Sequence, residues 1–135
     1  IHAAIRKATT IIDHYTKVLK DLRKILGNTE ERIAPIQITT IQEMIEWVIS
    51  KQKHWGDELD SVLTHYNMES KRNLSEHTQI QKLLNKILHY RAIFNKLSVN
   101  YTSIIYYQRE YLKDPHDPKV KDKYYKLLRD HQLIE

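Results

Sequence analysis

The stretch IQKLLNKILHYRAIFNKLSVNYTSIIYYQREYL, residues 80–112, decides the fold. Its apolar residues recur at seven-residue steps in two rows, which are Ile80, Ile87, Phe94 and Tyr101, and Leu83, Tyr90, Leu97, Ile104 and Tyr111. Since no Gly or Pro lies between Asn73 and Asp114, this pattern predicts one helix of about 40 residues, ~60 Å long at ~1.5 Å per residue. A helix of this length indicates a long-helix bundle.

Two helices are expected before this stretch. Residues 1–26 carry an apolar stripe at about three of every seven positions, which is the width of a core-facing bundle helix, and Gly27 provides a stop. The next helix is expected at residues 40–66, capped by Thr39 or Thr40, with Glu43 placed as in a capping box. The apolar connection around Ile33 is expected to fold over one end of the core.

The long helix is expected at residues 72–113, with Ser75 as a fair N-cap, and a fourth helix at residues 118–134. Asp117 is suited to the N-cap of the fourth helix and Pro118 to its first turn. Short turns make neighbouring helices antiparallel. We therefore predict an all-α fold in one domain, an antiparallel bundle of three long helices plus a shorter C-terminal fourth helix.

The composition of the chain limits the classes of function that it can have. The chain has 135 residues, enough for one core, and it has no Cys, which excludes disulfides and thiolate chemistry. We expect neither a signal peptide nor a membrane span in these residues, because no apolar run approaches the ~20 residues that a span needs. We expect a soluble, intracellular protein with its compartment left open. Because the chain starts at Ile1 rather than Met, we also expect an excised domain or a processed product.

The net charge of +5 is unevenly distributed. Residues 1–27 carry six basic and two acidic groups, residues 28–69 carry three and eight, and residues 70–113 carry eight and two. One interpretation is that the acidic helix neutralises two basic neighbours within the bundle. The other is that the basic surface binds an acidic partner.

The end of the long helix is rich in tyrosine. If the second helix begins near residue 40, everything after residue ~100 overhangs it by about 20 Å. The overhang includes Tyr106, Tyr107 and Tyr111. Either the fourth helix folds back and buries this end, or the tyrosines form a partner or self-association surface, because Tyr combines rigid contact area with a polar end.

Trp47 lies about 120° away from the apolar stripe of the second helix, beside Met44 and His54. A Trp on a polar face is a plausible binding hot spot, and the alternative is that it packs under another segment. Gln52 and Arg91 interrupt apolar stripes at about the same level, near Tyr15. They are candidates for a buried polar layer, unless Arg91 extends along the stripe edge into solvent.

On the first helix, four basic residues fall within ~60° of one another, opposite the core. They are Arg6, Lys17, Lys20 and Lys24. Such a stripe can follow phosphates on nucleic acid or an anionic membrane surface, or it can be an ordinary solvated face. No zinc-finger or helix-turn-helix signature supports sequence-specific recognition.

Catalysis and metal binding have little support. The eight histidines include no His-Glu-x-x-His or Glu-x-x-His pattern, and His54 and Glu58 alone make a poor metal site. There is no Gly-rich phosphate loop, so we expect no catalytic, cofactor-binding or metal-binding residues, although carboxylates inside bundles can still be catalytic. The leading hypothesis is a non-enzymatic interaction, scaffold or assembly module that binds a protein partner or itself. The alternative is a basic coat, architectural or membrane-surface protein that binds nucleic acid or anionic lipid.

Overall fold

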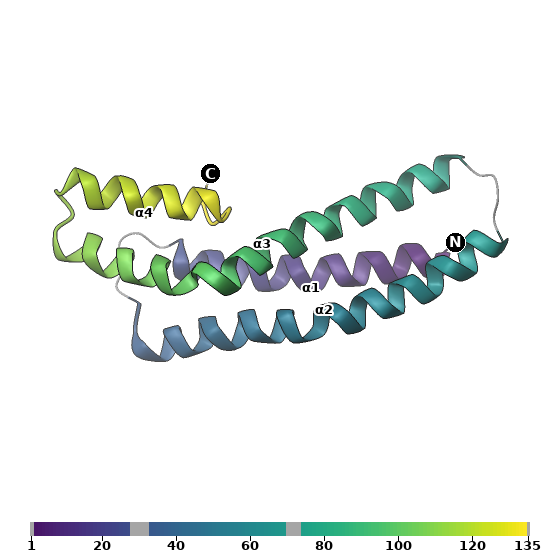
Figure 1. The fold of residues 1–135 in the computed structure, drawn as a ribbon, viewed down its shortest axis with the longest axis horizontal. Coiled ribbons are helices and arrows are strands. Elements are labelled where there is room, and N and C mark those ends of the chain that lie inside the picture. The colour runs from purple at the N-terminus through teal and green to yellow at the C-terminus, as the bar shows by residue number, and fades with distance from the viewer. Residues whose placement is uncertain (1, 28–32, 70–73, 135) are drawn as a thin grey trace.

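The computed structural model describes residues 2–27, 33–69 and 74–134, and four α-helices account for most of these residues (Figure 1). They are α1 (His2–Leu26), α2 (Pro35–Glu69), α3 (Leu74–Lys113) and α4 (Pro118–Asp130). The described residues contain no strand. The predicted all-α class is confirmed, and α3 is the longest helix with 40 residues.

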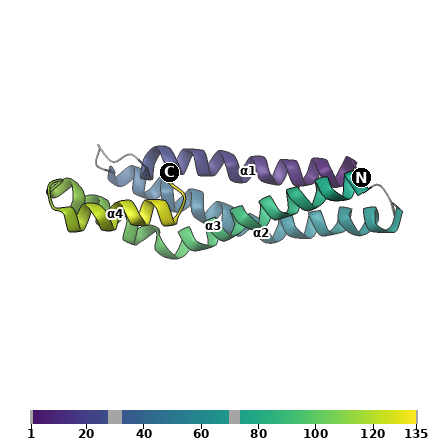
Figure 2. The same ribbon diagram turned by 90° about the horizontal axis from the view of Figure 1, so that it is seen from above.

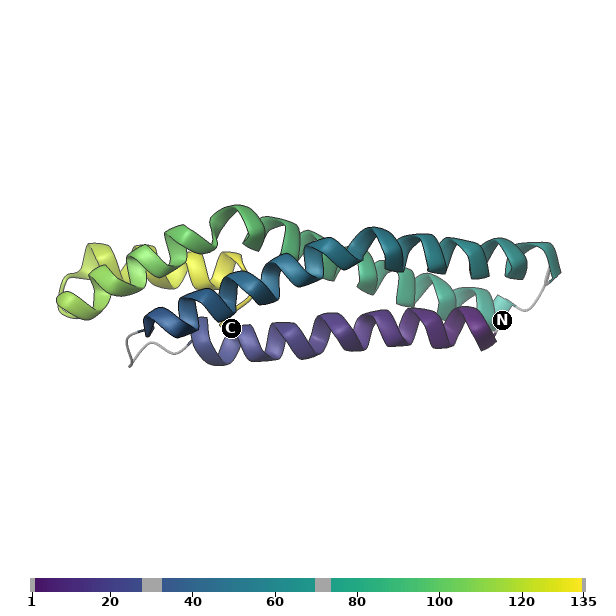
Figure 3. The same ribbon diagram turned by 90° about the horizontal axis from the view of Figure 1, so that it is seen from below.

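The three long helices pack against one another along the molecule, with α2 antiparallel to α1 and α3 (Figures 1 and 3). Helix α4 turns back along the C-terminal half of α3 and ends near the middle of the molecule (Figures 1 and 2). The core contains one apolar face from each helix. Its largest completely buried side chains include Tyr15, Phe94, Leu97, Ile104, Tyr124 and Leu128.

Helix α2 begins earlier than predicted. Pro35 takes the first helical position, where its missing N–H has no cost, and the Gln37 amide oxygen accepts a hydrogen bond from the Ala34 N–H at 2.8 Å. The hydroxyls of Thr39 and Thr40 instead donate back to carbonyls one turn earlier inside the helix. The predicted start at residue 40 is therefore wrong, and the predicted capping box does not form.

The expected cover over one end of the core is only partly present. Ile33 is buried, whereas Ile36 is 77 % exposed. Helix α2 also extends to Glu69, beyond the predicted end at residue 66. Helix α3 begins at Leu74, so Ser75 lies inside its first turn, and the turn before it lies outside the described residues.

Helix α4 starts as predicted but ends at Asp130 rather than residue 134. The Asp117 side chain caps it by accepting a hydrogen bond from the Lys119 N–H at 3.0 Å. At the other end, Gln132 has a φ of 59°, and the Leu133 N–H donates to the Leu128 carbonyl at 2.8 Å. This is a Schellman turn with Gln in the position that Gly usually takes. It reverses the chain so that Leu133 is buried.

Helix α4 is attached to the C-terminal end of α1 by three close approaches. The Tyr124 hydroxyl donates to the Leu26 carbonyl at 3.0 Å, and Arg23 Nε donates to the Gln132 carbonyl at 2.8 Å. A Cβ added at Gly27 would lie 2.9 Å from the Leu133 carbonyl oxygen. Gly27 therefore follows the end of α1 as predicted. The close approach of Leu133 also leaves no room for a side chain at this position.

Candidate functional site

The predicted partner-binding residues do not form one surface. Trp47 lies on α2 at its contact with α1, Tyr106 lies on α3, and Tyr111 lies between α3 and α4. Trp47 is 42 % exposed and Tyr106 is 56 % exposed, whereas Tyr111 is partly buried. We therefore describe the Trp47 region and the tyrosine region separately.

Trp47 belongs to an aromatic cluster with Trp55 and His14, which we call the Trp47 face. The Trp47 ring meets Trp55 edge-on, with ring centroids 5.6 Å apart, and it meets His14 in the same way at 6.0 Å. His14 stacks flat on Trp55 at 5.2 Å. Because Trp55 is buried, the cluster anchors the exposed ring of Trp47 to the core in one orientation.

Next to this cluster, Glu58 forms an ion pair with Lys7 of α1 and contacts the imidazole of His54 on its own helix. His54, which was predicted beside Trp47, is thus largely exposed and faces Glu58. Met44 is partly buried and packs against the core. Sequence reasoning missed His14 and Trp55 as members of the cluster, and the only signal was the eight-residue spacing of the two tryptophans, about two helical turns.

The tyrosine region is mostly internal. Tyr124 is completely buried and contacts Tyr111, with ring centroids 5.6 Å apart. Burial raises the pKa of Tyr124 to about 12, although a hydrogen bond to Gln108 opposes this effect. Tyr107 is partly buried, and the Lys123 ammonium group lies 5.8 Å from its ring centroid. Helix α4 therefore covers the overhang of α3, and Tyr106 remains as its exposed tyrosine.

A polar layer crosses the bundle at Gln52, which is buried. The Tyr15 hydroxyl donates to Gln52 Oε1 at 2.8 Å, and Gln52 Nε2 donates to Asn95 Oδ1 at 3.0 Å. Burial raises the pKa of Tyr15 to about 12, and the positive charge of Arg91 opposes this effect. Arg91 itself is exposed. Its predicted place in the layer is corrected: the partner from α3 is Asn95, one turn later, which is itself exposed and accepts the hydrogen bond from Gln52 at the surface end of the layer.

The four predicted phosphate-binding residues of α1, which are Arg6, Lys17, Lys20 and Lys24, are all exposed. Two of them continue into a concave surface. Lys20 and Lys24 line a cavity of about 480 Å³, together with Arg23 of α1 and Tyr90 of α3. Basic side chains thus lie both on the outer side of α1 and along its border with α3.

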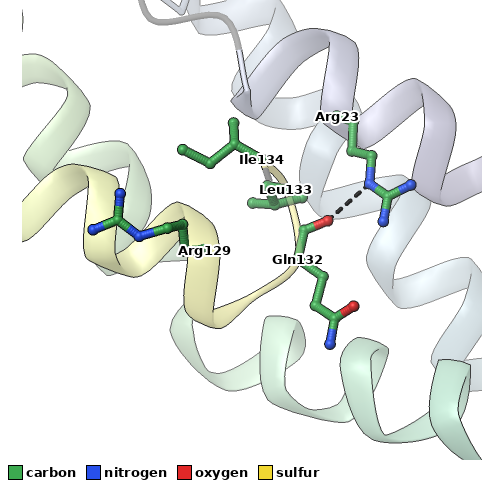
Figure 4. Close-up of a pocket in the computed structure, with 5 residues that line it drawn as sticks. All are labelled: Arg23, Arg129, Gln132, Leu133 and Ile134. Atoms are coloured by element: carbon green, nitrogen blue, oxygen red, sulfur yellow. Dashed lines mark hydrogen bonds between the residues drawn. The ribbon is translucent and has the colours of Figure 1, made fainter.

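A second cavity of about 460 Å³ lies where α4 ends against α1. Figure 4 shows Arg23 and Arg129 on opposite sides of Leu133 and Ile134, with the Arg23 guanidinium directed at the Gln132 carbonyl. The two guanidinium groups do not converge on one point. The cavity is thus a junction between helices rather than a pocket for a single anion.

Among the described residues, no cluster of three or more His, Asp or Glu side chains has the arrangement of a metal site. In the same part of the chain, no helix combines the length and the apolar character required to cross a membrane. Comparisons of the sequence with protein-family models and curated proteins, and of the structure with solved structures, find no match.

Proposed function

We propose that this protein is a non-enzymatic helical interaction module that binds another protein through the Trp47 face. The observation that carries the proposal is the placement of Trp47, which is 42 % exposed although its ring contacts Trp55 and His14. A large ring that is already held in place loses little conformational entropy on binding. This is why exposed and well-supported Trp side chains are frequent binding hot spots.

The surroundings of Trp47 suit the edge of an interface. Glu43 and Glu46 lie on the adjacent positions of α2 and are exposed, as are Ser50 and Lys51. A hydrophobic centre with a polar rim is the usual anatomy of a protein interface. Tyr106 offers a second, smaller patch on α3, where it meets Tyr107 edge-on with ring centroids 5.1 Å apart.

The proposal is tested by truncating Trp47. The wild-type protein is used to recover partners from an extract of the source cells, and each recovered protein is purified and titrated by calorimetry. We expect Trp47→Ala to weaken binding by about 2 kcal/mol or more, roughly 30-fold. The matched control is Val99→Ala, which removes an apolar side chain that is 78 % exposed on α3.

Two outcomes contradict the proposal. The first is a partner whose affinity is unchanged by Trp47→Ala, and the second is an equal loss of affinity in the Val99→Ala control. Tyr106→Ala distinguishes the two aromatic patches. A loss of binding confined to Tyr106→Ala would move the interface from the Trp47 face to the outer side of α3.

A second candidate function rests on the stripe of α1. Because Arg6, Lys17, Lys20 and Lys24 are all exposed, the stripe is available to the phosphates of nucleic acid or anionic lipid. This candidate predicts binding to duplex DNA, RNA or anionic vesicles that weakens steeply with added salt. If no such binding is detected at low ionic strength, the candidate is excluded.

A further inference from the structure

Helix α4 packs along the C-terminal half of α3 and reaches α1 only near the C-terminal end of α1. It runs back from the C-terminal end of α3, and its last backbone contacts are the hydrogen bond from Lys96 Nζ to the Asp130 carbonyl at 3.1 Å and that from Arg23 to Gln132. The N-terminal halves of α1 and α3 continue beyond this point without a fourth helix beside them (Figures 1 and 2). We call this uncovered part the open α1/α3 groove.

The open groove begins at the cavity of about 480 Å³ that is lined by Thr16, Leu19, Lys20, Arg23, Lys24 and Tyr90. Leu19 is buried to 1 % exposure and Tyr90 is partly buried, so the floor of the cavity is apolar. Its rim on α1 is formed by three cations. An apolar floor with charged borders is the geometry of a groove that receives an amphipathic helix.

The α3 side of the groove is also basic. Helix α4 contacts α3 at Lys96 and Tyr107, and positions seven, fourteen or twenty-one residues earlier lie on nearly the same side of a helix. From Lys96 these positions are His89 and Lys82, and from Tyr107 they include Ile93 and Lys86. The side of α3 that receives α4 therefore continues with Lys82, Lys86 and His89 around a buried Ile93.

The helix that packs on the other side of α1 and α3, α2, is acidic. It has six acidic and two basic residues, and it packs against both α1 and α3, each of which has six basic and two acidic residues. Helix α4 does not balance these charges, because it has five basic and two acidic residues. The open groove thus has no acidic helix beside it, whereas the opposite side of the α1/α3 pair is occupied by one.

We propose that the open α1/α3 groove docks an acidic amphipathic helix of another protein, which completes the four-helix arrangement at this end. Its apolar stripe packs on the partly exposed ring of Tyr90, and its carboxylates face Lys20, Lys24 and Lys86. About 15 residues of groove span ~22 Å, so the ligand helix has about four turns. The Tyr90 ring favours a helix over duplex DNA, because the phosphates of a duplex gain nothing from an aromatic side chain. This site is separate from the Trp47 face and does not depend on it.

The probe is a capped synthetic peptide of about 18 residues, made of Leu, Glu and Ala, with Leu at helical spacing and Glu on both borders of the Leu stripe. Binding to the full chain is followed by fluorescence anisotropy and by amide chemical shifts. We expect a Kd in the micromolar range and shifts centred on Thr16, Leu19 and Tyr90. The variant Lys20→Glu with Lys24→Glu should weaken binding at least tenfold. The matched control is Lys51→Glu with Lys53→Glu, which makes the same charge change on exposed positions of α2 and should change the Kd less than twofold.

Several results overturn the proposal. Equal weakening by both double variants would mean that only net charge attracts the peptide, and undiminished binding of a peptide with Leu replaced by Ser would mean that the apolar floor is not used. DNA or anionic vesicles that bind more tightly than the peptide and depend on Lys20 and Lys24 would assign the cations to phosphate. A dimer that is lost in the Lys20→Glu and Lys24→Glu variant would assign the groove to a second copy of the chain. Since Trp47→Ala should leave peptide binding unchanged, failure of this proposal and failure of the Trp47 proposal are distinguishable.

Discussion

The two ends of the bundle are built on the same pair of helices, α1 and α3, but they are closed in different ways. At the end that holds α4, this fourth helix packs on α3 and reaches the end of α1, with Tyr124 completely buried and bonded to the Leu26 carbonyl. Toward the opposite end no fourth helix covers the pair (Figure 1), and already in the middle of the bundle Tyr90, which stacks on Tyr15, is only partly buried. Helix α4 therefore closes only one end of the bundle. Loss of its packing should affect that end far more than the other.

The largest expected effect comes from removing the closure at Tyr124. Tyr124→Ala deletes a ring with no exposed surface and should lower the free energy of unfolding by about 3–5 kcal/mol. Tyr90→Ala, in the part of the bundle that α4 does not cover, should cost about 1–2 kcal/mol because its ring is only partly buried. Urea denaturation followed by circular dichroism measures both, and equal losses would remove the distinction between the two ends.

The two glycines are expected to respond to Ala substitution with opposite changes in stability. A Cβ at Gly27 would lie 2.5 Å from the Arg23 carbonyl oxygen and 2.9 Å from that of Leu133, whereas a Cβ at Gly56 would meet nothing within 4 Å. We expect Gly27→Ala to destabilise the protein by about 1–3 kcal/mol. Gly56→Ala, inside helix α2, should stabilise it by about 0.5–1 kcal/mol. A thermal melt decides the signs, and a stabilising Gly27→Ala would mean that Leu133 does not approach α1 so closely.

Alkaline pH acts on buried phenols in both the closed end and the middle of the bundle. Burial raises the pKa of Tyr124 and of Tyr15 to about 12, from 10.0. Between these two pKa values the folded state keeps the phenol protons that the unfolded chain releases. The free energy of unfolding is therefore at its full value below pH ~10 and falls as the pH rises toward ~12. Replacing both residues by Phe should flatten the decline in a series of urea denaturations, whereas Tyr106→Phe, at an exposed site, should leave it unchanged.

The smallest expected effect concerns the cations that line the cavity between α1 and α3. Lys20 and Lys24 are exposed, so the variant Lys20→Glu with Lys24→Glu should change stability by no more than ~0.5 kcal/mol per site. Differential scanning calorimetry checks this. A loss of several kcal/mol would show that these residues support the fold. A binding defect of the variant could then not be separated from its loss of stability.

The helices were predictable because their apolar periodicity is strong. The seven-residue rows of α3 place Phe94, Leu97 and Ile104 in the core, where the structure has them. The helix ends were less predictable. Thr40 with Glu43 and Pro35 with Gln37 both resemble a helix start, and a local pattern does not say which one forms. The end of α4 was missed because Gln132 takes a left-handed conformation that Gln rarely adopts.

Contacts between helices were the least predictable part of the candidate site. The level of the polar layer at Gln52 and Tyr15 followed from antiparallel packing, but the choice of Asn95 over Arg91 depends on one turn of register. Likewise, Trp47 could be singled out from its position off the apolar stripe. Its support by His14 depends on how α1 and α2 face each other, which the sequence of either helix alone does not specify.

The central claim is that α4 closes the tyrosine-rich end within one chain and leaves the Trp47 face for a different protein. Light scattering after gel filtration, over a hundredfold range of protein concentration, tests it most directly. The account predicts a mass of 16.2 kDa at every concentration, and the same monomer for Trp47→Ala. A stable dimer or a larger assembly would contradict it, because the end of α3 or the Trp47 face would then be covered by another copy of the chain.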